Sequence, residues 1–281
     1  MKQFRESLKV LSWVLRRVLP QQEGTWAILM YHRVTGDSGL QLDVDFRDFE
    51  AQMRWLARHG RVVSLDEALD AAEGGVPVWH DRPTFVLTFD DAFQDFYTTA
   101  WPILQGLGFP STLYVPTGFV EHSKRVPLSR GVKRKGALAP VSWAMLGELV
   151  ESPLVTIGAH THGHYELPSL SDHRVEEEIC QCDELLQEKL GIVVKHFAYP
   201  RGVWDERVER FVKKHYRSAV HVGGGPVTGD RCDRYRLPRI PVQASDRMRW
   251  FEARIGGDLR YEESAVRILK RLGRSTKKRE Y

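Results

Sequence analysis

Short apolar runs alternate with stretches of helical periodicity along most of this chain. Residues 45–59 place Phe46, Phe49, Met53 and Leu56 at helical spacing, and residues 171–190 are rich in Glu, Leu and Gln. This alternation predicts βα units around a mostly parallel sheet or barrel. The expected strands are the apolar runs 26–31, 84–89, 111–115, 154–158, 194–199 and 217–222.

Two polar sequences follow these runs directly, where parallel βα folds carry their functional loops. The first is the pair Asp90 and Asp91, after the run 84–89. Neighbouring strand residues point to opposite faces, but a turn at the strand's end can bring both carboxylates to one site. Two close carboxylates repel each other unless a proton or a cation lies between them. Alone, the pair favours a solvated loop over a functional site.

The second polar sequence is rich in histidine. His160, His162 and His164 lie within five residues of a chain that has 11 histidines. Neutral imidazole is a ligand of Zn²⁺ and related cations, and Gly163 is expected to let the chain bend so that the rings converge. The alternative is a polar surface loop, but the position of the histidines directly after a predicted strand favours a metal site.

Together the two sequences supply the composition of an open catalytic metal site. His160, His164 and one aspartate give three ligands and leave room for water. The second aspartate provides a nearby base, which predicts a metal-assisted hydrolase.

Four short motifs occur in order at 30–34 (Met-Tyr-His-Arg-Val), 88–91 (Thr-Phe-Asp-Asp), 160–164 (His-Thr-x-x-His) and 197–202 (Phe-Ala-Tyr-Pro-Arg-Gly). Together they resemble the motifs of the polysaccharide deacetylase family (NodB-like, carbohydrate esterase family 4), and the resemblance covers about residues 26–242. It implies an α/β fold, a distorted (β/α) barrel of about seven strands. It also implies an enzyme that hydrolyses an N-acetyl or other N-acyl group from an amino sugar of a glycan or of a lipid- or nucleotide-linked saccharide.

The resemblance also assigns roles at the metal. It makes Asp91, His160 and His164 the ligands of a divalent cation, expected to be Zn²⁺ with Co²⁺, Ni²⁺ or Mn²⁺ as alternatives. Asp90 becomes the general base.

The third motif is expected to contact the substrate through Tyr199, Pro200 and Arg201. The backbone N–H of Arg201 is the expected donor to the oxyanion of the tetrahedral intermediate.

The sequence departs from the family pattern at three places. Ala92 replaces the glycine that usually follows the two aspartates, and Ala198 stands where many members have an arginine that contacts the base. Arg239 is expected to orient Asp90 instead, the alternative being an ordinary surface arginine. The late Leu-x-His motif that supplies the general acid is not recognisable. His32 is the expected substitute, and otherwise a buried structural histidine.

The net charge of +4 is distributed unevenly, with basic residues concentrated in 1–20, 121–140 and 267–281. The predicted organisation is a basic amphipathic helix over 1–22, the deacetylase domain over 23–258 and a basic helix or tail over 259–281. The terminal helices either contact an anionic membrane or dock on the barrel with their charges in solvent.

The basic segment 121–140 follows the run 111–115, on the expected active-site side. Lys124, Arg125, Lys133 and Arg134 are expected to bind a phosphate or pyrophosphate of a phosphate-linked amino sugar. Nucleic acid is not an expected partner, because no basic surface interleaved with aromatic residues occurs.

Several features predict a cytoplasmic location, including the inner face of the cytoplasmic membrane. Residues 1–20 lack the uninterrupted apolar core and the cleavage site of a secretory signal peptide. No apolar run approaches the ~20 residues that a transmembrane helix needs.

Two other functions are compatible with the sequence. One is a catalytically weak, metal-containing glycan-binding protein that lacks the general acid. The other is a metal-dependent phosphatase that uses Asp90, Asp91 and Asp95, a reading that leaves the histidines without a role.

Overall fold

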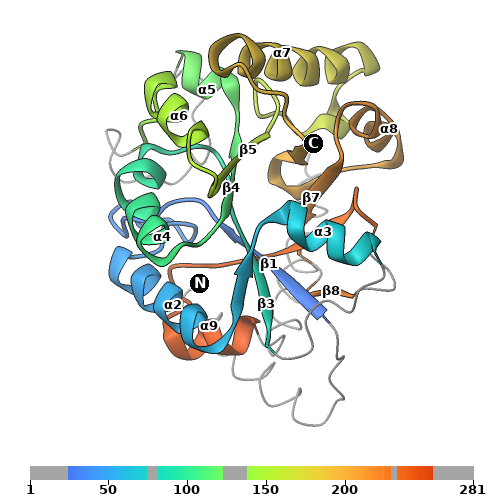
Figure 1. Ribbon diagram of the computed structural model, residues 1–281. Helices are drawn as coiled ribbons and strands as arrows, with labels where there is room; N and C mark the ends of the chain where they lie inside the picture. The colour runs from blue at the N-terminus through green and yellow to red at the C-terminus, as the bar shows by residue number, and fades with distance from the viewer. Residues whose placement is uncertain (1–24, 75–81, 123–137, 224, 229–232, 256–281) are drawn as a thin grey trace, which may run out of the picture.

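The computed structural model describes residues 25–74, 82–122, 138–223, 225–228 and 233–255 (Figure 1). The predicted terminal segments 1–22 and 259–281 lie outside the described residues, as do Lys124, Arg125, Lys133 and Arg134. The strands are β1 (Thr25–Tyr31), β2 (Arg61–Val63), β3 (Thr84–Phe89), β4 (Ser111–Val115), β5 (Val155–Ala159), β6 (His196–Ala198), β7 (Ser218–Val222), β8 (Val227–Thr228) and β9 (Leu237–Pro241). The α-helices are α2 (Phe46–His59), α3 (Leu65–Glu73), α4 (Trp101–Leu107), α5 (Thr117–His122), α6 (Trp143–Val150), α7 (Asp172–Leu190), α8 (Glu206–His215) and α9 (Met248–Ile255).

Parallel strands close into a barrel, as the sequence predicted. Their order is β1-β3-β4-β5-β6-β7-β9, and β9 pairs again with β1. β2 adds to the first half of β3, and β8 lies antiparallel to β1. The helices lie around the outside of the strands (Figure 1).

Each strand expected from the apolar runs is present, with small shifts at the ends. β9 was not predicted from the sequence, because Pro238, Arg239 and Pro241 interrupt the apolar pattern expected of a buried strand. Prolines are uncommon inside a sheet, since they lack the N–H that pairs with a neighbour. The strand nevertheless completes the barrel between β7 and β1.

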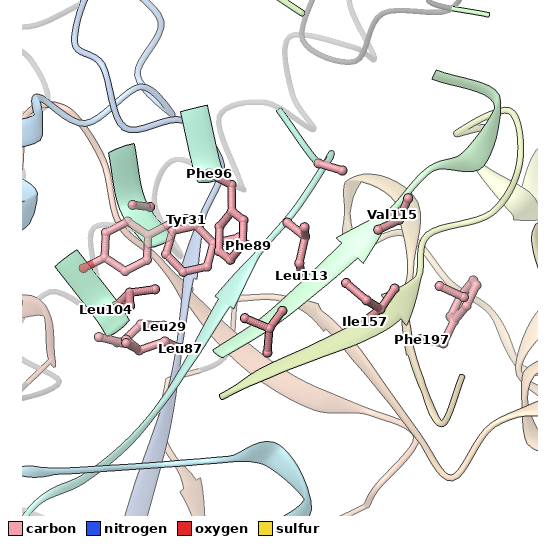
Figure 2. Close-up of a cluster of buried hydrophobic side chains, with 14 of the residues drawn as sticks. Leu29, Tyr31, Leu87, Phe89, Phe96, Leu104, Leu113, Val115, Ile157 and Phe197 are labelled. Carbon is pink, nitrogen blue, oxygen red and sulfur yellow. The ribbon is translucent and has the colours of Figure 1, made fainter. Parts of the chain in front are cut away.

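The outward side chains of the strands form the larger core. Leu29 and Tyr31 of β1 and Leu87 and Phe89 of β3 belong to one buried cluster with residues of the surrounding helices (Figure 2). The rings of Tyr31 and Phe89 stack with centroids 5.4 Å apart. Burial of such side chains contributes about 1.5–3 kcal/mol each, so this layer fixes the positions of the strands.

The alternate, inward side chains fill the barrel itself. Trp26, Val86 and Tyr114 belong to a second buried cluster, together with Leu65 and Leu69 of α3. These α3 residues pack at the amino-terminal ends of the strands and close that end.

Charged side chains reinforce this closure. Arg217, directly before β7, forms ion pairs with Asp66, Asp70 and Glu73 of α3. The opposite end of the barrel, where the strands terminate, remains available for chemistry.

Among the described residues, no helix combines the length and the apolar character needed to cross a membrane.

Candidate active site

The polar residues expected at the strand ends converge at one end of the barrel. His32 follows β1, Asp90 and Asp91 follow β3, and His160 follows β5. Parallel pairing aligns the carboxyl ends of these strands at one edge. Arg239 differs, because it reaches the same region from within β9.

Asp91, His160 and His164 form a buried cluster. Their potential ligand atoms all lie within 4.8 Å of one another. Oδ1 of Asp91 lies 3.6 Å from Nε2 of His160 and 3.3 Å from Nε2 of His164. Nδ1 of His160 donates a hydrogen bond to the Ala198 carbonyl at 2.7 Å, which directs Nε2 into the cluster.

Positive φ angles create this convergence. Asp91 has φ 73° and Ala92 has φ 49°, so the chain turns at the end of β3 and brings both carboxylates to one region. The left-handed conformation costs a non-glycine residue roughly 1–2 kcal/mol. Glycine adopts this conformation without that cost, whereas Ala92 adopts it under strain.

The histidine loop turns differently from the prediction. Thr161 and His164 have positive φ angles of 65° and 54°, whereas Gly163 does not appear among the left-handed glycines. Gly163 is required for another reason: an added Cβ would lie 2.4 Å from the ring of Tyr165. The glycine therefore permits close packing rather than the bend.

The cluster fits a divalent cation. Neither carboxylate oxygen of Asp91 has a hydrogen-bond partner among the described residues, although the side chain is almost fully buried. Burial, and then the charge of Asp90, raise the pKa of Asp91 well above its usual range. Burial lowers the pKa of both His160 and His164. A buried carboxylate beside two neutral imidazoles is a donor set that a cation such as Zn²⁺ would satisfy.

Asp90 has a different partner. Arg239 donates from Nη1 to Oδ1 at 2.5 Å and from Nη2 to Oδ2 at 2.6 Å, and both side chains are buried. Nη1 also donates to Thr88 Oγ1 at 3.2 Å. Burial is the largest single influence and opposes ionisation of Asp90. The charge and hydrogen bonds of Arg239, with smaller contributions from His160 and His32, together outweigh burial and hold the pKa of Asp90 well below its usual range. Arg239 is therefore no surface arginine, and it occupies the place predicted for a residue that orients Asp90.

His32 is buried on the same side of the barrel, and its Nδ1 has no hydrogen-bond partner in the described part of the chain. Burial lowers the pKa of His32 to about 4, against the opposing charge of Asp90. At neutral pH the imidazole is therefore uncharged.

The residues of the third motif differ in burial. Tyr199 is buried in the outer core, and its hydroxyl donates to the Tyr235 carbonyl at 3.3 Å. Pro200 is buried as well. Arg201 has φ 57°, is about half exposed and pairs with Glu166 at 3.1 Å. Of these residues, Arg201 has the exposed side chain. Its charge adds to the larger effects of burial and His160 in lowering the pKa of His164.

Asp95 does not join the two aspartates. Its carboxylate accepts hydrogen bonds from Arg33 Nε at 3.0 Å and from the Val34 N–H at 2.6 Å. These contacts hold the loop after His32 and occupy the carboxylate that a phosphatase with three aspartate ligands would need.

Three residues without a predicted role support the site. Thr88 contacts Arg239, and the ring of Tyr114 lies 5.4 Å from the Arg239 guanidinium. Glu178, from α7, contacts the histidine loop. Alternate residues of a strand point into the barrel, and this pattern along β3 and β4 could have identified Thr88 and Tyr114. Helical periodicity shows that one side of α7 is buried but does not show that Glu178 contacts this loop.

Comparisons with known proteins agree with this geometry. The family model for polysaccharide deacetylase matches residues 79–220. Poly-β-1,6-N-acetyl-D-glucosamine N-deacetylase of Escherichia coli (strain K12) is 23% identical over 272 residues, covering 84% of this chain and 39% of that protein. The enzyme of the same name from Staphylococcus aureus (strain MRSA252) is 24% identical over 248 residues, covering 80% of this chain and 81% of that protein. The chain thus spans well under half of the Escherichia coli relative.

A solved structure shares the fold. Streptococcus pyogenes deacetylase PplD, in complex with acetate, aligns with a TM-score of 0.68 and 21% identity over 82% of this chain and 98% of that chain. The family match includes β3, β5 and the loops that carry both aspartates and both histidines. The chain therefore belongs to the polysaccharide deacetylase (NodB-like) family of carbohydrate N-deacetylases, as its motifs predicted.

Proposed function

We propose that this protein is a metal-dependent hydrolase that removes an N-acetyl group from an amino sugar. One observation carries the proposal: Asp90, held by Arg239, lies beside the Asp91, His160 and His164 cluster at the open end of the barrel. The arrangement separates a base from a set of ligands, which is what metal-assisted amide hydrolysis needs.

A divalent cation bound by Asp91, His160 and His164 would act as a Lewis acid and lower the pKa of a bound water. Residues of the chain carry out the remaining steps. Asp90 is ionised at neutral pH and accepts a proton, and Arg239 orients its carboxylate.

His32 is the proposed general acid for the leaving amine. Its pKa of about 4 leaves His32 neutral in the resting protein. It would therefore receive the proton that Asp90 takes from the attacking water and pass that proton to the leaving amine.

The proposed substrate is a glycan or a smaller saccharide that contains N-acetylglucosamine. The named activity of the two relatives supports the amino sugar. Arg201 adds a half-exposed positive charge beside the cluster, suited to an anionic substituent such as a phosphate. Zn²⁺ is the proposed metal, with Co²⁺, Ni²⁺ and Mn²⁺ as alternatives.

Acetate release tests the function. Purified protein is incubated with N-acetylated glucosamine oligosaccharides, with and without a chelator, and acetate is quantified. We expect release that the chelator abolishes and that added Zn²⁺ or Co²⁺ restores. A metal-loaded protein that binds the oligosaccharide without releasing acetate would instead support the glycan-binding alternative.

The basic segment supports the finer proposal of a phosphate-linked substrate. The chain on either side of it contacts the site loops: Gly118 donates to the His162 carbonyl at 2.9 Å, and Val141 donates to the Ala92 carbonyl at 2.9 Å. Charged hydrogen bonds to phosphate contribute about 1.5–3 kcal/mol each, so several of them strongly affect binding.

Neutralising Lys124, Arg125, Lys133, Arg134 and Lys135 is therefore expected to raise KM for a phosphorylated N-acetyl amino sugar at least about tenfold. KM for the same sugar without phosphate should stay constant. A control variant carries glutamine at Lys195, Arg210 and Lys214, exposed positions outside the segment. An unchanged KM for the phosphorylated substrate would contradict the proposal.

The cytoplasmic location and the membrane contact of the terminal helices stay predictions. Fractionation of cells that express the full chain, with and without residues 1–22, tests both.

A further inference from the structure

The loop that carries the two histidines is held in an unfavourable backbone conformation. Thr161 and His164 both have positive φ angles, and the β-branched Thr161 is a clear outlier in that region. Such residues cost about 1–3 kcal/mol each and persist only where surrounding contacts determine them. The position of the His164 ring therefore depends on what the loop packs against.

On one side the loop contacts α5. The Gly118 N–H donates to the His162 carbonyl at 2.9 Å, and Thr117 Oγ1 hydrogen-bonds His162 Nδ1 at 3.0 Å. The middle histidine of the motif thus anchors the loop to α5, consistent with its absence from the cluster around Asp91.

On the other side the loop contacts Glu178 of α7. Glu178 Oε2 accepts a hydrogen bond from the Gly163 N–H at 2.5 Å, and the Glu178 carbonyl accepts one from the His162 N–H at 3.0 Å. Two successive N–H groups directly before His164 are bound by this one residue. An added Cβ at Gly163 would lie 2.9 Å from Glu178 Oε1, so the carboxylate packs tightly on the loop.

The support behind Glu178 is rigid. Its side chain is 3% exposed, and its neighbours on the same side of α7, Val175, Ile179 and Cys182, are fully buried in the main core. A buried carboxylate is stable only where hydrogen bonds satisfy it, and bonds to an ionised acceptor are about twice as strong as neutral ones. Arg174 adds an ion pair at 3.6 Å, but its side chain is half exposed and this pair contributes little.

We propose that Glu178 is a positioning residue that fixes the 160–164 loop through its reach to the Gly163 N–H and thereby sets the affinity of the metal site. The inference rests on the proposed function only in taking His164 as a ligand. Without this bond the loop relaxes from its unfavourable φ angles, and the His164 ring moves away from Asp91. Loss of a group that orients a ligand typically weakens metal binding 10–100-fold.

Two variants separate the effect of side-chain length at position 178 from the effect of its charge. Glu178→Asp keeps the charge and the fold of α7 but withdraws the carboxylate by one carbon–carbon bond. Glu178→Gln keeps the reach and an acceptor oxygen but removes the charge. Glu177→Asp is the control, since Glu177 is exposed on the same turn and pairs with Arg174.

The measurement is the dissociation constant of Co²⁺ for the full-length protein, obtained by chelator competition, together with the visible spectrum of the bound ion. We expect about 10–100-fold weaker binding and an altered spectrum for Glu178→Asp. Glu177→Asp should stay close to wild type. Glu178→Gln should lose less affinity than Glu178→Asp, because it keeps the reach although its neutral acceptor forms a weaker hydrogen bond. Wild-type affinity in Glu178→Asp, or an equal loss in Glu178→Gln, would overturn the inference.

Failure of this inference is distinguishable from failure of the proposed function. A wild-type protein that binds Co²⁺ but releases no acetate would overturn the activity and leave Glu178 in its role. A wild-type protein that binds no Co²⁺ would overturn both.

Discussion

Replacing Asp90 by asparagine is expected to lower kcat/KM for N-deacetylation about 10²–10⁴-fold while leaving the metal bound. Asp90 faces Arg239, whereas the metal-binding cluster consists of Asp91, His160 and His164. Asparagine keeps the shape and a hydrogen-bond acceptor but cannot take up a proton at neutral pH. The rates of acetate release and the metal content of the purified variant check this prediction.

The matched control is Asp91→Asn, which changes the neighbouring residue in the same way. Asp91 has no hydrogen-bond partner among the described residues, and its Oδ1 lies near both imidazoles. Its loss is therefore expected to remove the metal first and activity as a consequence. Circular dichroism should show that both variants stay folded. If Asp90→Asn lost the metal as well, Asp90 would be a ligand rather than the base.

Replacing Arg239 by methionine is expected to destabilise the protein by about 3–5 kcal/mol at neutral pH. The methionine removes the partner of a carboxylate that is itself buried, and an uncompensated buried charge is among the costliest changes in a protein interior. The free energy of unfolding, measured with urea on metal-free protein, gives the size of the effect.

The loss of stability in Arg239→Met should become smaller as the pH falls. In the wild type the pKa of Asp90 lies below its unfolded value, so the pair stabilises the protein above pH ~4 and this contribution is lost as pH falls further. Without Arg239, burial raises the pKa of Asp90. The variant then takes up a proton in its folded state on acidification, and the difference between the two proteins shrinks.

A double variant provides the control. Adding Asp90→Asn to Arg239→Met removes the buried charge, so most of the lost stability should return while deacetylation stays as low as in Asp90→Asn. Strictly additive losses in the double variant would contradict a direct coupling between the two residues.

Much of the barrel follows from local patterns. The apolar runs located β1 and β3–β7, because a strand buried on both faces is mostly apolar. β9 did not follow, since its prolines and arginine are tolerated only through its place between β7 and β1.

The sequence predicted which residues would carry the proposed chemistry, because Asp90, Asp91, His160 and His164 stand in family-like motifs at the ends of strands that apolar patterning reveals. The family resemblance also predicted a base and a set of ligands among them, with Arg239 beside Asp90. The tertiary structure supplies the contacts that such roles require. Arg239 lies 149 residues from Asp90 in sequence, and only barrel closure brings its guanidinium to that carboxylate and leaves Asp91 to the histidines. Contacts between distant segments depend on packing, which no local pattern encodes, and the same holds for Glu178 beneath the histidine loop.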